Sequence, residues 1–315
     1  LYTVEDDTVT NDQLKEKVNP TAVEGFTPTK NDIADIPTTA KKAGQTLEVP
    51  ATVTYTKGTE TIPVKTKVDV VVLPKVTPEG VKVLKDSTGL EEVVKAKATE
   101  AATATTKLPD GVTVRVKEVK AGTVPATTAT GVQTPATAVV EYVKDGNVVA
   151  TKEVTVPVTV VGSTPKSVVV FEGDTVEAKT VQDAVTPGTD GTKGNPAIPE
   201  DLTKATGKKE VTVPVTYEGV KDPEQVKVPV TVLPVAKGEV TVPKGETTDK
   251  VKEVAKAKAE EVANSADFKA KLPDGAKDVE VGAITEEVLA AITSEAGSNK
   301  GTVKVPVTYT VDGVK

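Results

Sequence analysis

The sequence predicts a mainly β protein with short helices, built from small modules that follow one another along the chain. Three observations predict this class. Short segments rich in Val and Thr recur, they alternate apolar and polar residues as a strand with one buried face does, and turn residues separate them. With 315 residues, the chain is long enough for about two to four domains.

The repeat is carried by a strand that ends in tyrosine. Its clearest copy is Glu210-Val-Thr-Val-Pro-Val-Thr-Tyr217, in which Val213, Val215 and Tyr217 share one face. Copies of this strand, some of them loose, stand at 47–55, 135–142, 210–217 and 301–309. After the first three copies, turn residues such as Asp145-Gly146 lead to a second Val-rich strand, which predicts a hairpin.

Two landmarks with a longer period set the modules. Lys107-Leu-Pro-Asp-Gly111 returns as Lys271-Leu-Pro-Asp-Gly275, and Leu73-Pro74 returns as Leu233-Pro234. The order is therefore short, long, short, long. We expect four modules, numbered 1 to 4 in chain order, at 1–74, 75–165, 166–235 and 236–315.

Helical segments make the second and fourth modules longer. Apolar residues at helical spacing predict helices over 10–18, 88–102, 180–185, 247–271 and 285–295. Thr88-Gly-Leu-Glu91 has the pattern of a capping box. The counterpart of the last helix, at 122–131, contains Pro125 and is not expected to be helical.

Proline inside the strands limits pairing. Because proline removes a backbone donor, it is expected at sheet edges or where pairing stops. This expectation applies to Pro157, Pro214, Pro229 and Pro306.

Val/Thr-rich hairpins with few aromatic residues are typical of a small β-sandwich of immunoglobulin-like character, here without Trp or Cys. Three Phe and five Tyr cannot fill four large cores, so the cores must be slim and aliphatic. Short Leu-Pro connectors predict modules docked end to end in a monomeric rod, each adding about 30–45 Å.

Composition excludes most chemistry. The chain has no His and no Cys, which excludes imidazole bases, thiolate nucleophiles, zinc fingers and haem ligation. A net charge of −7 argues against nucleic acid, and no apolar run approaches the roughly 20 residues of a membrane span. We expect no enzyme, no cofactor, no metal and no catalytic residue.

Four adjacent acidic pairs and a few other features are candidate sites. The pairs are Asp6-Asp7, Glu91-Glu92, Glu260-Glu261 and Glu286-Glu287. Neighbouring residues do not face each other on a helix, so surface charge explains the pairs better than acid–base chemistry. Thr189–Asn195 offers one carboxylate, which favours a flexible surface loop over a calcium loop. Glu residues interleave the Lys-rich face of 250–258, which offsets its charge. An intramolecular Lys–Asn isopeptide bond would need a buried Lys, Asn and acid together, and Asn is scarce here and expected in turns, so it is the less favoured alternative.

The chain also resembles a known family. Four short motifs spread over Gly173–Val232 resemble the Rib/alpha-like surface repeat of Gram-positive bacteria. They are Gly-Asp-Thr-Val, Val-Gln-Asp-Ala-Val, Val-Thr-Val-Pro-Val-Thr-Tyr and Val-Lys-Val-Pro-Val-Thr-Val. Modules 2 and 4 resemble longer variants of this repeat. The resemblance implies an atypical immunoglobulin-like fold in tandem arrays on the cell wall, extracellular, with the anchor outside this segment.

Two functions remain. The resemblance favours a structural stalk that projects an adhesive domain away from the cell wall; the alternative is that the repeats themselves bind a host or bacterial ligand. Binders usually display aromatic or Arg anchors, and this chain has no Trp and the single Arg115. The expected partners are neighbouring repeats of the same chain, with any surface ligand bound by a domain outside the segment.

Module 4 ends within its hairpin turn, at Val311-Asp-Gly-Val-Lys315, whereas module 2 continues into a closing strand. We therefore expect the closing strand of module 4 to lie outside this sequence. The edge at 303–309 is expected either to present unpaired backbone groups or to be satisfied by the next part of the parent protein.

Overall fold

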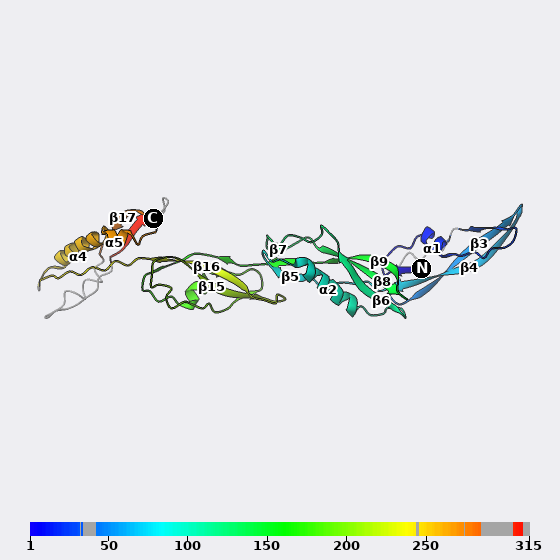
Figure 1. The fold of residues 1–315 in the computed structure, drawn as a ribbon, viewed down its shortest axis with the longest axis horizontal. Helices are drawn as coiled ribbons and strands as arrows, with labels where there is room; N and C mark the ends of the chain where they lie inside the picture. Colours follow the sequence, from blue (N-terminus) through cyan, green and yellow to red (C-terminus); the bar gives the residue numbers. More distant parts are fainter. Residues whose placement is uncertain (32, 34–41, 244–245, 274, 285–304, 311–315) are drawn as a thin grey trace. The chain divides into compact units, whose positions relative to one another are not determined.

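A computed structural model describes the chain except for residues 32, 34–41, 244–245, 274, 285–304 and 311–315 (Figure 1). Strands outnumber helices among the described elements, so the predicted mainly β class with short helices is confirmed. Contacts divide the chain into two compact units, 1–161 and 162–315. The four-module division stays a prediction, and the module numbers denote residue ranges only.

Module 1 is built around a long hairpin. Its elements are β1 (Tyr2–Val4), α1 (Asn11–Lys17), β2 (Thr27–Lys30), β3 (Thr46–Lys57) and β4 (Glu60–Leu73), with the sheet order β1-β4-β3-β2. The hairpin strands β3 and β4 are antiparallel, and β1 runs parallel to the end of β4. Leu14 of α1 is fully buried against Val49 and Val70 of the hairpin, because these residues face the same core.

Module 2 repeats this plan with a longer helix. Its elements are β5 (Val81–Leu84), α2 (Leu90–Ala104), β6 (Val112–Val119), β7 (Gly131–Val132), β8 (Ala136–Lys144), β9 (Asn147–Val156) and β10 (Val158–Val161). The sheets have the orders β6-β8-β9 and β5-β10-β7. Asp145 and Gly146 have φ of 49° and 80°, which is the two-residue turn that the Asp-Gly sequence predicted between β8 and β9.

Module 3 has the same sheet order as module 1. Its elements are β12 (Val168–Phe171), α3 (Ala178–Asp183), β13 (Val185–Thr186), β14 (Gly191–Lys193), β15 (Gly207–Tyr217) and β16 (Glu224–Leu233). The last strand within the range of module 2, β11 (Thr164–Pro165), pairs with β13. The order β12-β16-β15-β14 again places the first strand parallel to the last one. The predicted faces are confirmed, because Val213, Val215 and Tyr217 are buried while Thr212 and Thr216 are exposed.

The described part of module 4 contains fewer elements. These are α4 (Thr248–Ala263), α5 (Ala266–Lys269), β17 (Lys277–Val281) and β18 (Val307–Thr310), with β17 antiparallel to β18. This pair corresponds to β6 and β8 of module 2, since Tyr142 and Tyr309 end the repeated strand in the two modules.

The helix predictions need corrections. The capping box at Thr88–Glu91 is wrong: Gly89 is the N-cap, with φ of 78°, and no side chain caps the helix. A capping box is instead present in α1, where Thr10 and Gln13 satisfy each other's backbone amides. The helix predicted over 247–271 is interrupted after Ala263, since Ser265 caps a second short helix, α5.

The remaining helix predictions have mixed outcomes. The helix predicted at 180–185 lies two residues earlier, at α3, and the helix predicted at 10–18 is confirmed as α1. Residues 122–130 contain turns and bends but no helix, as expected, and Gly131 begins β7. The helix predicted at 285–295 lies outside the described residues.

The prolines lie where pairing with one neighbour begins or ends. Pro157 separates β9 from β10, and Pro306 directly precedes β18. Pro214 lies where β14 has ended, and its carbonyl accepts a hydrogen bond of 2.7 Å from the Gly194 amide. Pro229 comes one residue before the part of β16 that pairs with β12. The missing donors therefore fall at the ends of ladders, as predicted.

Candidate functional site

The acidic pairs that the structure describes lie at least partly on the surface, and two of them form ion pairs. Glu91 and Glu92 are exposed in the first turn of α2. Glu260 and Glu261 lie 3.8 Å and 2.7 Å from Lys256 and Lys258. The pair Glu286-Glu287 lies outside the described residues. In the part of the chain that the structure describes, no group of three acidic side chains is placed to hold a metal ion.

Asp6 and Asp7 differ from the other pairs, because both reach into module 2. Asp6 lies 3.7 Å from Lys75, and Asp7 accepts a hydrogen bond from the Lys152 ammonium. The Asp7 and Lys152 side chains are about two-thirds buried, with 33% and 37% exposed. This pair therefore joins module 1 to module 2 in a partly desolvated position, where charge attraction is stronger than at the surface.

The centre of the loop predicted at Thr189–Asn195 is a short strand. Residues 191–193 form β14, which pairs with 215–217 of β15. Sheet pairing occupies the backbone of 191–193, so the prediction of a flexible loop is wrong for these three residues, whereas 189–190 form an exposed turn.

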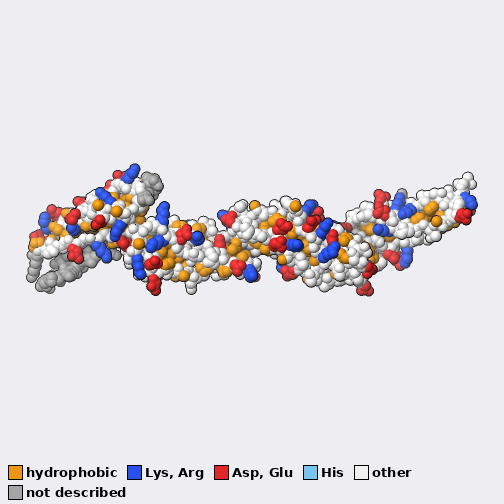
Figure 2. All heavy atoms as spheres, viewed as in Figure 1, with side chains coloured by type: hydrophobic (Ala, Val, Ile, Leu, Met, Phe, Trp, Pro, Cys, Tyr) orange, Lys and Arg blue, Asp and Glu red, His pale blue; other side chains and the backbone are white. Residues whose placement is uncertain are grey.

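The Lys-rich face of α4 carries alternating charge. Lys250 and Lys252 lie 2.9 Å and 3.9 Å from Glu253 and Asp249. Figure 2 shows acidic and basic side chains interspersed on the face in view, with no large area of one sign. The field of the lysines is thus offset locally, as the interleaved Glu residues predicted.

Arg115 also has a defined partner. Its Nε and one terminal nitrogen lie 3.0 Å and 2.8 Å from the same carboxylate oxygen of Glu141, across β6 and β8. Glu141 is only 8% exposed, so the arginine satisfies a nearly buried charge. Its role in the structure is cross-strand stabilisation.

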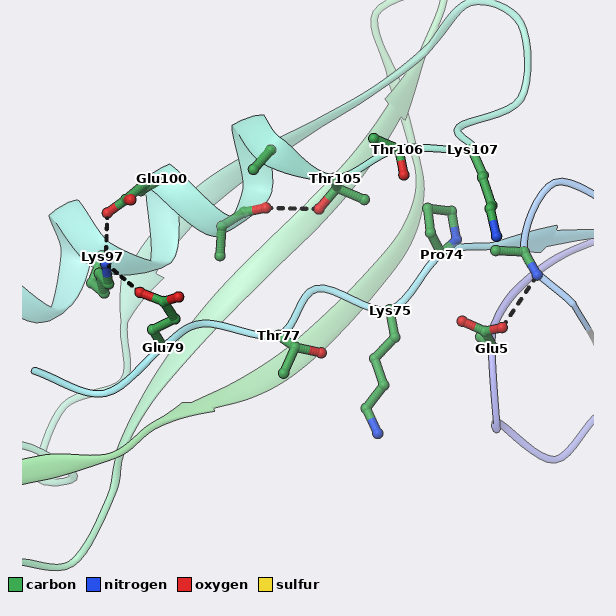
Figure 3. A pocket seen from close by; sticks show the side chains of 13 residues that line it. Glu5, Pro74, Lys75, Thr77, Glu79, Lys97, Glu100, Thr105, Thr106 and Lys107 are labelled. Carbon is green, nitrogen blue, oxygen red and sulfur yellow. Dashed lines mark hydrogen bonds and ion pairs between the residues drawn. The ribbon is translucent and has the colours of Figure 1, made fainter.

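A pocket of about 440 Å³ lies where module 1 meets module 2 (Figure 3). Its lining includes Glu5, Lys75 and Lys107, together with the side chains of α2 that face the junction. Lys97 lies 3.1 Å from Glu79 and 2.9 Å from Glu100, so its charge is already paired. No aromatic side chain lines the pocket. The pocket therefore offers few groups for an organic ligand to anchor to.

The contact beside this pocket is far better packed. Val4, Leu73 and Val76 belong to one continuous core with the buried residues of module 2, and Leu73 is fully buried. This core crosses the Leu73-Pro74 connector without interruption. Each Å² of apolar surface removed from water contributes about 25 cal/mol to stability, so the shared core stabilises both modules.

A buried tyrosine closes the junction. Tyr142, at the end of β8, is 0% exposed, and its hydroxyl donates a hydrogen bond to the Pro74 carbonyl oxygen. Burial, with a smaller contribution from the negative charge of Asp7, raises the pKa of Tyr142 to about 12. The hydroxyl therefore stays protonated and remains a donor at neutral pH.

The repeated tyrosine makes a comparable contact in the other hairpins. Tyr55 donates to the Thr21 carbonyl oxygen at 2.8 Å. The Tyr217 hydroxyl lies 2.8 Å from Ser163 Oγ, in the segment that enters module 3, and 3.1 Å from a Glu224 oxygen. Burial is also the main cause that raises the pKa of Tyr217.

Sequence reasoning assigned these tyrosines only to the core. The signal that could have revealed their role was a hydroxyl at the same place in every copy of the repeat, since a buried hydroxyl needs a partner. Among the described helices, none is both long and apolar enough to cross a membrane.

Comparisons with known proteins place the chain in no family. No protein-family model matches it, and no curated protein matches it. Solved structures match it only distantly. A titin segment of three immunoglobulin domains is 8% identical, with 70% of this chain and 84% of that chain covered and a TM-score of 0.20. Drosophila N-cadherin EC1-3 is 9% identical, with 75% and 97% covered and a TM-score of 0.17.

An endo-fucoidan hydrolase of glycoside hydrolase family 107 is 10% identical, with 69% of this chain covered and a TM-score of 0.16. The chain spans 38% of the length of that enzyme. Similarity at these TM-scores carries no argument about what the chain binds or does.

Proposed function

We propose that this chain is a non-catalytic, structural segment of the stalk of a bacterial surface protein, formed by Rib/alpha-like repeats that hold an adhesive domain away from the cell wall. The observation that carries the proposal is the core that continues across Leu73-Pro74. A stalk needs junctions that keep their geometry, and a shared core with a buried hydrogen bond supports that need.

Three further contacts support a fixed junction. The Lys152–Asp7 ion pair joins β9 to the segment after β1. The Lys144 ammonium lies 5.9 Å from the centre of the Tyr2 ring. The Asp6 carboxylate of module 1 lies 3.7 Å from the Lys75 ammonium of module 2.

The alternative function, in which the repeats themselves bind a ligand, requires a surface patch with aromatic or Arg side chains. Lys75 and Lys97 of the pocket at the junction are in ion pairs, and no aromatic side chain lines the pocket, which favours the stalk. In the proposal, the chain is extracellular, its wall anchor lies outside this segment, and any host or bacterial ligand is bound by another domain of the parent protein. Its own partners are then the neighbouring repeats.

Single-molecule energy transfer across the junction tests the proposal. The chain has no cysteine, so two introduced cysteines can be labelled cleanly. Thr61→Cys in module 1 and Thr128→Cys in module 2 are at exposed positions in unit 1. A narrow transfer distribution is expected, equal in width to that of a control pair within module 2, Glu92→Cys and Thr128→Cys. A distribution as broad as that of a flexible linker would contradict the proposal.

Small-angle scattering of the whole chain gives a second test. The end-to-end arrangement predicted from the sequence requires an extended particle with about 30–45 Å for each module. Scattering typical of a compact globule would refute the stalk.

A further inference from the structure

One position of the repeated hairpin carries a different type of side chain in each of modules 1 to 3. It lies on the second strand, directly opposite the valine that stands two residues before the repeat tyrosine. The residues at this position, here called the entry position, are Val64, Lys152 and Glu224. Four residues later, the same strands all carry a buried valine: Val68, Val156 and Val228. The core of the hairpin is therefore kept, while the charge at the entry position changes from module to module.

In modules 2 and 3, the entry position contacts chain that comes before the module's own hairpin. Lys152 donates a hydrogen bond to the Asp7 carboxylate, which belongs to module 1. Glu224 accepts hydrogen bonds from the amide and the hydroxyl of Ser163, at 3.0 Å and 2.6 Å, in the segment that enters module 3. The side chain at the entry position therefore determines which preceding groups fit.

Asp7 also has counterparts in the other modules. It follows β1, and its amide donates to the carbonyl oxygen three residues earlier, at 3.0 Å. The same turn follows β5 and β12, where the amides of Ser87 and Asp174 donate to the carbonyl oxygens three residues earlier, at 3.2 Å and 3.0 Å. These three residues occupy one equivalent position, here called the exit position. It is acidic in modules 1 and 3 and neutral in module 2.

The charges at the two positions follow the order of the modules. Module 1 has the acidic Asp7 at its exit, and module 2 has the cationic Lys152 at its entry. Module 2 has the neutral Ser87 at its exit, and module 3 has the acidic Glu224 at its entry. A carboxylate at the entry of module 2 would face the Asp7 carboxylate where both groups are only about one-third exposed, and like charges repel strongly in such a position.

We propose that the exit and entry positions together specify which module can follow which. An exit turn with a carboxylate, as in module 1, is accepted by a lysine at the next entry position and repelled by a glutamate there. Specificity of this kind comes from the penalty on the wrong neighbour as much as from the ion pair with the right one. The assignment rests on the proposed stalk, since order matters only where junctions are fixed, and it adds what sets the order.

Charge changes in the full 315-residue chain test the assignment. Lys152→Glu gives module 2 the entry residue of module 3, and the Glu5 amide, beside the junction, should exchange at least about tenfold faster. Asp7→Ser gives module 1 the exit residue of module 2 and should also speed up this exchange, because Lys152 loses its partner. In the combined variant, exchange should return to within about threefold of the unaltered chain, since a serine hydroxyl can donate to the new carboxylate.

The matched control is the ion pair between Lys120 and Glu153, which are 2.7 Å apart and both in module 2. Lys120→Glu with Glu153→Ser should leave exchange of the Glu5 amide unchanged. If the effects of Lys152→Glu and Asp7→Ser simply add, or if Lys152→Glu alone has no effect, the assignment is overturned. Either result leaves the stalk standing, because the stalk fails on a different measurement, a broad energy-transfer distribution in the chain with native charges.

Discussion

Replacing Tyr142 by phenylalanine isolates the hydrogen bond that closes the junction between module 1 and module 2. The ring stays in the core, and only the hydroxyl that donates to the Pro74 carbonyl oxygen is lost. Because Tyr142 is 0% exposed, water does not replace the bond easily. Loss of such a bond destabilises by about 1–2 kcal/mol, which is a factor of about 5–30 in the opening equilibrium.

Hydrogen exchange followed by mass spectrometry reads this effect on both sides of the connector. The Glu5 amide, which donates to the Leu73 carbonyl oxygen at 2.8 Å, reports on module 1. The Val81 amide, which donates to the Pro157 carbonyl oxygen at 2.8 Å, reports on module 2. Both amides should exchange about 5–30 times faster in the Tyr142→Phe variant.

Tyr55→Phe is the matched control, because Tyr55 occupies the same place in its hairpin but donates to Thr21 within module 1. In the Tyr55→Phe variant, amide exchange should become faster in module 1, and the exchange rate of the Val81 amide should not change. If Tyr142→Phe changes module 2 alone, the modules are not coupled through this contact and the reasoning is refuted.

Three further predictions concern single groups. Glu224→Ala removes the carboxylate that accepts hydrogen bonds from the amide and hydroxyl of Ser163 and from Tyr217. The free energy of unfolding of module 3, measured by urea titration, should fall by about 2–3 kcal/mol. Glu224→Gln should lower it by an intermediate amount. Gly188→Ala should lower the melting temperature, because its Cβ would lie 2.7 Å from the Gly162 carbonyl oxygen; an unchanged melting curve would contradict the close packing. The folded pKa of Tyr142, about 12, is above its ordinary value of 10.0, so its contribution to stability is complete below pH 10 and is lost as the pH rises towards 12. Urea midpoints measured across this range should fall less steeply in Tyr142→Phe than in the unaltered chain.

Local patterns predicted the hairpins and missed contacts between distant residues. Alternating Val and Thr indicated β15 and its buried face, and Asp145-Gly146 indicated the turn, because both signals lie within a few residues. The parallel pairing of Tyr2–Val4 with β4 has no such signal, since three residues carry no readable period. The capping box at Thr88 failed for a local reason: Gly89 adopts a left-handed conformation and begins the helix without a side-chain cap.

The junction was only partly predictable. The short Leu-Pro connectors predicted that neighbouring modules dock, and the core across Leu73 agrees with that expectation. The partner of the Tyr142 hydroxyl is 68 residues away, and the partner of Lys152 is 145 residues away. Such pairs depend on the relative placement of two hairpins, which periodicity within one strand does not encode. The strand at 191–193 was missed because Gly191 and Lys193 have low β propensity and only Thr192 favours a strand, so the pairing depends on the neighbouring β15.

The parallel pairing of first and last strands determines how a module responds when its ends are pulled apart. In β12 and β16, the pairs run from Val168 with Val230 to Phe171 with Leu233, and both strands point the same way. Tension applied to the entering end of β12 and the leaving end of β16 slides one strand along the other. The backbone bonds between them are then loaded together in shear, instead of opening one after another as in a zipper. Unfolding under force is governed by the unfolding rate. This short pair of strands therefore determines how fast the module unfolds when it is pulled.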